Sequence, residues 1–392
     1  MPTKDHFERG KRHYEQRNYQ KAINEYEKAL KTNSNNLHLV WVHMGKAYGK
    51  LNVHHKAIEC YQKALEMNFE YYEAWMLIGG AYYYLDEYEK AIGAYHRAAD
   101  INPGSADPWL LMGIVYGRLG DYKNTLLCYK KALDRAPEDA AAWYSMGAVY
   151  SELDDHSKAF ECFQKALELK PDYVDAWYKL GVTYGRLGEH RAAIKYYETA
   201  LKFDQNDADV WYSMGIAHSE LNEHNEAIKC YEKAIEIKPD FADAWNLIGV
   251  SYDTLGEYKK ALKYFQKALK INPAFAKAWY NQGVVYGKRG DHKKTIECCL
   301  EAVKIDPDDA ATWNLLGTAC YYSGIYDRAI KYFKKALEID PNNAKAWGLM
   351  GLAYRLQNLP KMAFVCYKKA LELDPDLLFV KRSLADLKGR YE

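Results

Sequence analysis

The sequence lacks an excess of charge of one sign. It has 54 lysines and arginines against 53 aspartates and glutamates in 392 residues, so the formal net charge is +1. Nucleic-acid-binding domains usually carry a basic excess on one face, and we therefore expect no nucleic-acid partner. The charge is uneven along the chain, because residues 71–275 have an acidic excess and both ends have a basic one.

Long hydrophobic runs are also missing. No stretch approaches the roughly 18 apolar residues that span a bilayer. The polar start, Met-Pro-Thr-Lys-Asp-His, has no apolar core of the length that a secretory signal requires. We therefore expect a cytoplasmic protein without membrane insertion.

Recognisable catalytic and metal-binding motifs are absent as well. The sequence has no Cys-x-x-Cys pair, no His-x-x-x-His or His-Glu-x-x-His motif, no glycine-rich phosphate loop and no nucleophile elbow. Carboxylates are abundant but evenly distributed, so no pair stands out as acid and base. We expect no catalytic site, no cofactor and no metal.

A strict period of 34 residues is what the sequence does have. All of its tryptophans follow this period, and a glycine stands four residues after each one. The tryptophans are Trp41, Trp75, Trp109, Trp143, Trp177, Trp211, Trp245, Trp279, Trp313 and Trp347. A fixed period of this length indicates stacked units that bury a continuous core only together.

Each unit is predicted to be a helical hairpin. Trp177, Leu180 and Tyr184 have the spacing of one helical face, and a second amphipathic segment follows a short polar turn. The glycine after each tryptophan removes side-chain bulk, which predicts a close approach of the two helices. A proline in register ends eight units, while Phe69 and Gln205 occupy the other two slots, where we expect looser turns.

The pattern Trp-x-x-Leu-Gly-x-x-Tyr, followed by Ala, Phe, Ala and a closing Pro, resembles the tetratricopeptide repeat. The resemblance implies an all-α fold, a right-handed α-solenoid in which helix-turn-helix units form a superhelix. It also implies a degenerate N-terminal unit at 1–37, ten units over 38–377 and a C-terminal capping helix at 378–392. The unit at 276–309 departs most, through Gln282, Thr295 and Cys299, and its packing is predicted to be the weakest of the interior.

Cysteine and histidine recur at fixed repeat positions. Six cysteines share one position in the second helix: Cys60, Cys128, Cys162, Cys230, Cys298 and Cys366. Five histidines share another position with tyrosines of other units: His54, His156, His190, His224 and His292. We interpret both as packing positions and expect the cysteines to be small buried apolar residues in a reducing compartment.

The resemblance also suggests a binding face. In the resembling family, the first-helix face lines a concave groove that takes an extended peptide or a partner helix. Helical geometry places the positions two before, one after and five after each tryptophan on this face. The predicted partner-binding residues are Tyr144, Tyr178, Lys179, Tyr212, Asn246, Tyr280, Asn281, Asn314, Asp175, Asp209, Asp243, Arg118 and Arg186.

Two interpretations of this face are open. The tyrosines and asparagines could grip a peptide backbone, with the aspartates favouring a basic or mixed-charge segment. Alternatively, the tyrosines only pad contacts between neighbouring first helices. For the arginines we favour a structural role, in which adjacent units pair Arg118 with Glu152 and Arg186 with Glu220.

The sequence as a whole predicts a non-enzymatic scaffold that binds a protein or extended peptide in the concave groove. The alternative is a self-associating structural protein, a homo-oligomer that docks through convex patches or through an exposed closing helix with Leu377, Leu378 and Phe379.

Overall fold

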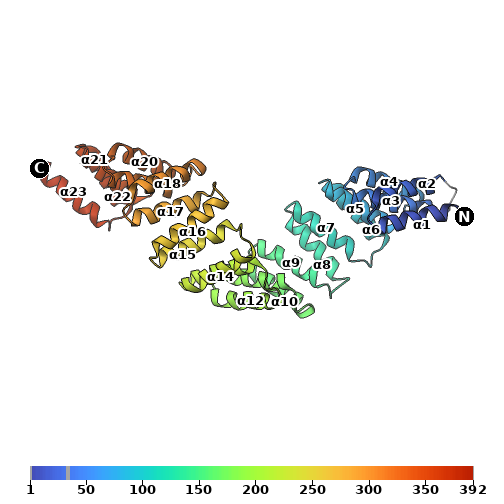
Figure 1. Cartoon of the computed structure of the whole chain (residues 1–392). Coiled ribbons are helices and arrows are strands. Elements are labelled where there is room, and N and C mark those ends of the chain that lie inside the picture. The colour runs from blue at the N-terminus through green and yellow to red at the C-terminus, as the bar shows by residue number, and fades with distance from the viewer. Residues whose placement is uncertain (1, 32–35, 392) are drawn as a thin grey trace. The chain divides into compact units, whose positions relative to one another are not determined.

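The computed structural model describes residues 2–31 and 36–391, and in that part of the chain it is built from α-helices without strands (Figure 1). The helices are α1 (Pro2–Glu15), α2 (Tyr19–Leu30), α3 (Leu37–Lys50), α4 (His54–Met67), α5 (Tyr72–Tyr84), α6 (Tyr88–Ile101), α7 (Asp107–Arg118), α8 (Tyr122–Leu133), α9 (Ala140–Glu152), α10 (His156–Leu169), α11 (Val174–Arg186), α12 (His190–Phe203), α13 (Ala208–Glu220), α14 (His224–Ile237), α15 (Ala242–Thr254), α16 (Tyr258–Ile271), α17 (Ala276–Lys288), α18 (His292–Ile305), α19 (Ala310–Tyr322), α20 (Tyr326–Ile339), α21 (Ala344–Leu356), α22 (Pro360–Leu373) and α23 (Leu378–Tyr391).

The helices pack as successive hairpins within two compact units, residues 1–186 and 187–392. In the first unit, α3 packs on α4 and α5 on α6, and the first helices α3 and α5 also touch. In the second unit, α15 packs on α16, α17 on α18, α19 on α20 and α21 on α22. The first helices of successive hairpins, α15, α17, α19 and α21, also touch. The predicted all-α class of stacked hairpins is confirmed. Residues 32–35, within the predicted N-terminal unit, lie outside the described residues.

A residue with positive φ, in the left-handed backbone region, stands in the turn between the two helices of these hairpins. Glycine, asparagine or aspartate supplies it in the ten units from α3 onward, at Asn52, Asp86, Gly120, Asp154, Gly188, Asn222, Gly256, Gly290, Gly324 and Asn358. These residue types tolerate positive φ best, since glycine has no Cβ and the short polar side chains bond locally. Between α1 and α2 this conformation falls on Arg17, at φ 59°.

In eight hairpins, an aromatic ring of the second helix fills the space above the glycine four residues after the tryptophan. A Cβ atom built on Gly249 would lie only 2.6 Å from Cε1 of the fully buried Phe265. Gly351 and Tyr367 have the same relation, also at 2.6 Å. The glycine is therefore required to seat the ring of its own hairpin.

The tryptophans form the joint between one hairpin and the next. In eight of the described repeats, the indole Nε1 donates a hydrogen bond to the backbone carbonyl six residues earlier. This bond is present at Trp75, Trp143, Trp177, Trp211, Trp245, Trp279, Trp313 and Trp347. The acceptors Phe69 and Gln205 receive it at 2.8 and 3.0 Å, as the prolines do elsewhere. The two turns without proline therefore keep the same contact.

Trp109 is the exception. Arg135 Nε donates to the Pro103 carbonyl at 2.6 Å, and the buried Trp109 Nε1 has no hydrogen-bond partner in the described structure. The Lys131 Nζ and the Arg135 guanidinium lie 4.1 and 5.3 Å from the centroid of this ring. Pro108 stands in the first turn of α7, which begins one residue later relative to its tryptophan than its neighbours do.

All eight cysteines are buried and free, which confirms that the six repeated ones are small core residues. Burial raises the pKa of Cys230 to about 12 and that of Cys128 to about 11. These thiols are therefore protonated and shielded, which is the opposite of what a reactive or metal-binding cysteine needs.

The unusual polar residues of the 276–309 unit are buried and hydrogen-bonded. Thr295 Oγ1 donates to the Gly283 carbonyl at 3.2 Å, and Cys298 Sγ donates to Gln282 Oε1 at 3.5 Å. Above Gly283 the usual ring is missing, and a built Cβ would lie 3.3 Å from Cys299 Sγ. The weaker packing of this unit stays a prediction.

The last helix, α23, packs on α21 and α22. Leu377 and Val380 are buried in the same core, whereas Leu378 is 65% exposed. The expectation that Leu377 is exposed was therefore wrong, because the residue before the helix turns inward and covers the final hairpin. In the described part of the chain, no helix combines the length and apolarity needed to cross a membrane.

Candidate partner-binding face

The predicted tyrosines lie between hairpins. In the first unit, the Tyr144 ring is half-buried and its centroid lies 5.0 Å from that of Tyr173 in the turn before α11. In the second unit, Tyr212 lies 4.6 Å from Phe241, which occupies the equivalent turn. Burial raises the pKa of Tyr144 to about 12, so its hydroxyl is a neutral group. Both rings pad contacts between successive hairpins, and only part of each ring faces solvent.

Tyr178, Lys179 and Tyr280 are also half-buried. Burial raises the pKa of Tyr280. The Lys179 Nζ lies 6.0 Å from the ring centroid of Tyr178 on the same helix, α11. These contacts are local and leave part of each side chain open to solvent.

The predicted asparagines form a partial ladder in the second unit. Asn246 on α15 is buried, and its Oδ1 accepts a hydrogen bond from Asn281 Nδ2 on α17 at 3.0 Å. Asn314 on α19 carries a buried Oδ1 without a hydrogen-bond partner in the described structure. The bond between Asn246 and Asn281 ties neighbouring first helices together. Asn314 does not extend this ladder to the next first helix through its Oδ1.

The predicted aspartates are the most accessible members of the set. Asp175, Asp209 and Asp243 are exposed and stand in the first turn of α11, α13 and α15. A carboxylate in this position interacts favourably with the positive end of the helix dipole. The same position leaves the charge free to meet a basic group of a partner.

The arginines reach back toward the preceding hairpin. Arg118 Nε donates to the Tyr83 hydroxyl at 3.1 Å, and Arg186 Nη1 donates to the Ser151 carbonyl at 3.3 Å. Within the described residues Arg118 forms no ion pair with Glu152, so that predicted pairing was wrong. In both cases the arginine is nine residues after its own tryptophan. It contacts the residue that is eight residues after the tryptophan of the preceding hairpin.

The first unit contains a groove that the sequence reasoning did not place. It has a volume of 870 Å³ and lies along the first helices α3, α5 and α7, with parts of α1, α4 and α6 contributing. Residues that line it include Gly49, Lys50, Met76, Leu77, Gly80, Tyr84, Leu111 and Ile114. Of these residues, Met76, Gly80 and Ile114 stand at positions that the sequence places on the binding face, but the prediction favoured the tyrosines farther along the chain.

Two glycines open the floor of this groove. A Cβ built on Gly80 would meet only the Tyr95 hydroxyl, at 3.8 Å, and one on Gly49 would meet only the Tyr61 hydroxyl, at 4.0 Å. These glycines seat no ring, unlike those that follow the tryptophans. Their missing side chains leave space that faces the groove.

The groove wall is aromatic. The Tyr84 ring is 70% exposed and stacks on His54, with centroids 5.1 Å apart and planes 11° from parallel. Ile114 is also exposed on α7. An exposed ring fixed by a neighbouring ring gives a rigid apolar surface at low entropy cost.

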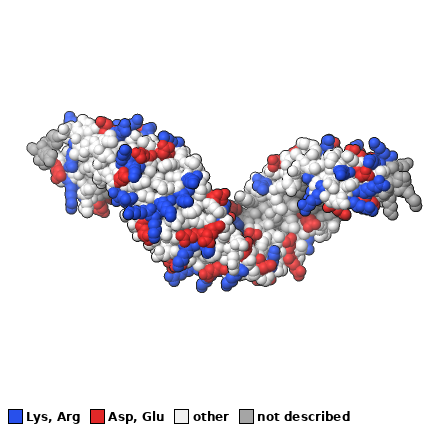
Figure 2. Space-filling model, viewed as in Figure 1, with Lys and Arg blue, Asp and Glu red and all other residues white. Residues whose placement is uncertain are grey.

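The groove is lined by nitrogen-bearing side chains and by no acidic ones. Lys46, Lys50 and His54 line it, and no carboxylate does. Lys46 forms an ion pair with Glu73, which also accepts a hydrogen bond from the Tyr71 hydroxyl at 2.7 Å. Elsewhere, acidic and basic side chains are interspersed on the face shown in Figure 2. The groove therefore differs from the aspartate-bearing positions of α11, α13 and α15.

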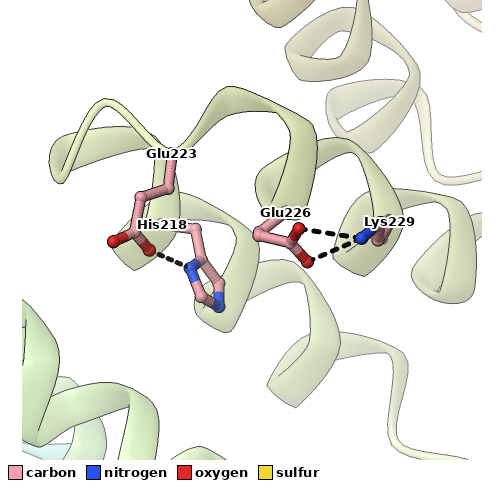
Figure 3. Close-up of polar contacts among 4 residues, drawn as sticks. All are labelled: His218, Glu223, Glu226 and Lys229. Atoms are coloured by element: carbon pink, nitrogen blue, oxygen red, sulfur yellow. Dashed lines mark hydrogen bonds and ion pairs between the residues drawn. The ribbon is translucent and has the colours of Figure 1, made fainter.

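A histidine contact in the second unit illustrates how the repeats compensate for departures. In five repeats, a tyrosine seven residues after the tryptophan lies under a lysine of the next helix, as Tyr252 does under Lys260 at 4.8 Å. Here His218 takes the tyrosine's place and its Nδ1 lies 2.8 Å from Glu223 Oε2 (Figure 3). Glu226 replaces the lysine and bonds Lys229.

These paired replacements keep a polar contact at the same joint. In the residues that the structure describes, no three histidine, cysteine or carboxylate side chains are grouped so that they could hold a metal ion.

Two family models match the sequence. The model for the cilia and flagella-associated protein 70 C-terminal domain matches residues 5–175. The tetratricopeptide repeat model matches six consecutive segments, 174–207, 208–241, 242–275, 276–309, 310–343 and 344–377. No curated protein sequence matches the chain.

Several solved structures are similar to the chain. YrrB, described as a tetratricopeptide repeat protein with an unusual peptide-binding site, is 25% identical, with a TM-score of 0.43, over 48% of this chain and 96% of its own. MamA is 30% identical, with a TM-score of 0.40, over 42% of this chain and 97% of its own. Yeast Tom70 is 16% identical, with a TM-score of 0.46, over 99% of this chain and 96% of its own.

The matches to the repeat model are contiguous and together cover more than half of the residues. Proteins built from this repeat generally act as scaffolds that bind other proteins or peptides. The chain belongs to the tetratricopeptide repeat family.

Proposed function

We propose that the chain is a non-enzymatic scaffold that binds a segment of a protein partner on its first-helix face, with the α3–α5–α7 groove as the main site. The observation that carries this proposal is the 870 Å³ groove with the exposed Tyr84 ring above a floor opened by Gly49 and Gly80. Partner segments bind where a concave, partly apolar surface stays open on a rigid scaffold.

The lining of the groove indicates the chemistry of the segment. Met76, Leu111 and Ile114 offer apolar contacts, and Tyr84 offers a ring face. Because Lys50 lines the groove, Lys46 lines it while paired with Glu73, and no carboxylate is among the lining residues, an acidic segment is electrostatically complementary. The proposed occupant is an extended or helical segment with an apolar or aromatic side chain flanked by acidic residues.

The residues predicted farther along the chain are proposed as additional contacts. Asp175, Asp209 and Asp243 are exposed and suit basic groups of a mixed-charge partner. Tyr144 and Tyr212 pack between hairpins, so their contribution to binding would come from the ring edges that stay open.

Filling the groove by Gly80→Leu is expected to weaken peptide binding in the groove while it keeps the fold. The new side chain starts 3.8 Å from the Tyr95 hydroxyl and extends into the groove, and leucine is a better helix former than glycine by about 0.5–1 kcal/mol. The probe is a fluorescein-labelled peptide in which one phenylalanine has two glutamates on each side. Fluorescence anisotropy should show an affinity at least about tenfold weaker than that of the wild type.

Gly93→Leu is the matched control. Gly93 lies in α6 of the same repeat, is exposed, and a built Cβ there meets nothing within 4 Å. This variant should bind the peptide as the wild type does. Equal affinity of the Gly80→Leu and Gly93→Leu variants, or no binding by the wild type, would refute the proposed site.

A second candidate function is self-association through the last hairpin. Val365 on α22 is 59% exposed, and the neighbouring Met362 and Phe364 are exposed too. Leu378 at the start of α23 extends the apolar surface available near this end of the chain. Such a group of exposed apolar side chains is typical of an interaction surface.

Light scattering coupled to gel filtration tests this candidate. Self-association through the last hairpin predicts a molar mass that rises with concentration toward that of a dimer. The double variant Val365→Glu and Leu378→Glu should then stay monomeric, because each glutamate would place a charge in the interface. A wild type that remains monomeric at every concentration removes the candidate.

A further inference from the structure

The aromatic cluster at the wall of the groove occurs a second time in the chain. Seven repeats after His54 and Tyr84, the same positions hold His292 and Tyr322. The His292 and Tyr322 rings are stacked with centroids 5.3 Å apart and planes 17° from parallel, close to the 5.1 Å and 11° of the first pair. Tyr322 is 62% exposed, which compares with 70% for Tyr84.

The neighbouring tyrosines repeat the geometry as well. The centroids of Tyr83 and Tyr84 lie 5.9 Å apart at 71°, and those of Tyr321 and Tyr322 lie 5.3 Å apart at 75°. Tyr83 meets Tyr88 at 6.0 Å and 53°. Its counterpart Tyr321 meets the next helix with the same geometry, at 5.9 Å and 56° from the Tyr326 ring. Each unit of the chain thus carries one copy of a four-ring cluster.

Cations flank both clusters. Lys50 and Lys288 stand at equivalent positions, four residues before the histidine. Lys288 shares its charge with Asp253, at 2.8 Å. On the other side, Arg118 bonds the Tyr83 hydroxyl, and the charge of Arg355 acts on Tyr321. Arg355 also pairs with Asp386 at 3.8 Å, so the basic groups beside the second exposed ring share their charge with carboxylates.

Packing of the repeat does not require these rings. At the positions eight and nine residues after the tryptophan, the eight other units have small or charged residues, or a leucine. These pairs are Gly49 and Lys50, Gly117 and Arg118, Ser151 and Glu152, Gly185 and Arg186, Ser219 and Glu220, Asp253 and Thr254, Gly287 and Lys288, and Arg355 and Leu356. Tyr83 and Tyr321 pack against the core of their units, whereas Tyr84 and Tyr322 are exposed. Since the other hairpins stack without aromatic residues at these positions, the two exposed tyrosines have a role outside the core.

We propose that the His292–Tyr321–Tyr322–Tyr326 cluster is a second docking site for the same class of segment as the α3–α5–α7 groove, so that one chain takes two copies of it. The inference rests on the proposed function of the groove. Each site accepts an apolar or aromatic side chain against the exposed tyrosine, with an acidic neighbour toward the flanking cations. The fitting partner presents this short motif twice, or two partner molecules bind together.

Isothermal titration calorimetry with the glutamate-flanked phenylalanine peptide, unlabelled, counts the sites on the full chain. We expect two peptides per wild-type chain, one for Tyr84→Ala, one for Tyr322→Ala and none for the double variant. Thr254→Ala, at the equivalent position of a unit without the cluster, is the control and should keep two sites. Both tyrosines are mostly exposed, so the variants should retain the wild-type helical circular dichroism.

The outcomes separate the inference from the function on which it rests. A wild-type stoichiometry of one that is abolished by Tyr84→Ala and unaffected by Tyr322→Ala overturns the second site but keeps the groove. A wild type that binds no peptide overturns both. Two sites that persist in the Tyr322→Ala variant also overturn the inference.

Discussion

Replacing Phe265 by alanine is expected to lower the free energy of unfolding by about 3–5 kcal/mol, the usual cost of emptying a large buried aromatic site. The ring is fully buried and fills the space above Gly249, where a Cβ would lie 2.6 Å from Cε1. No other side chain of this hairpin can take its place, because the backbones of α15 and α16 are held by their other contacts. Chemical denaturation followed by circular dichroism measures the loss.

The reciprocal substitution should depend on whether the ring is present. Gly249→Ala in the wild type is expected to destabilise by about 1–3 kcal/mol through overpacking, even after the gain in helix propensity. In the Phe265→Ala background the same change should stabilise, because the methyl group enters vacated space. Gly283→Ala, which faces Cys299 Sγ at 3.3 Å, is the control and should cost less. Additive effects of the two substitutions would contradict the direct contact.

Raising the pH above about 9 is expected to weaken the fold steeply. Burial raises the pKa of Cys60, Cys162, Cys230 and Cys298 from an ordinary 9.0 to about 12. A raised pKa means that the unfolded thiol loses its proton first. The stability is therefore fully present below pH 9 and is lost as the pH rises toward 12, by about 1.4 kcal/mol per pH unit for each thiol.

Urea denaturation at a series of pH values between about 8 and 11 measures this loss. Tyrosines also titrate in this range, so the informative quantity is the difference between the wild type and Cys230→Ala. The variant should be less stable near pH 8, because it leaves a small cavity, but its stability should fall less steeply by about 1.4 kcal/mol per pH unit. Parallel pH dependences would show that Cys230 is not buried as described.

The period of the sequence was sufficient to predict the hairpins and the buried cysteines, because both depend on positions that recur within one unit. The direction of Arg118 could not be obtained in this way. Whether that side chain meets Glu152 or Tyr83 depends on how successive hairpins cross, and the structure places it on the preceding one. Glu152 is 34 residues after Arg118 and Tyr83 is 35 residues before it, so the repeat period alone does not decide between the two partners.

The candidate site shows the same limit. Tyr144 was predicted to lie on the binding face, but its contact with Tyr173 joins residues of two successive hairpins and is visible only once they are stacked. The groove was missed because its depth comes from the absence of side chains at Gly49 and Gly80. The adjacent pair Gly79-Gly80 was the available signal, since Gly79 seats the Tyr95 ring and Gly80 has no such role.

The bond between eight of the indoles and the carbonyl six residues earlier gives the protein a set of built-in optical reporters. Because this bond lies at the junction of two repeats, separation of the repeats changes the surroundings of a single chromophore and therefore its emission. Tryptophan emission therefore reports separation of neighbouring repeats more directly than it reports disruption inside one hairpin. Trp109, which lies against two cations and lacks the shared acceptor, provides an internal reference with a different environment.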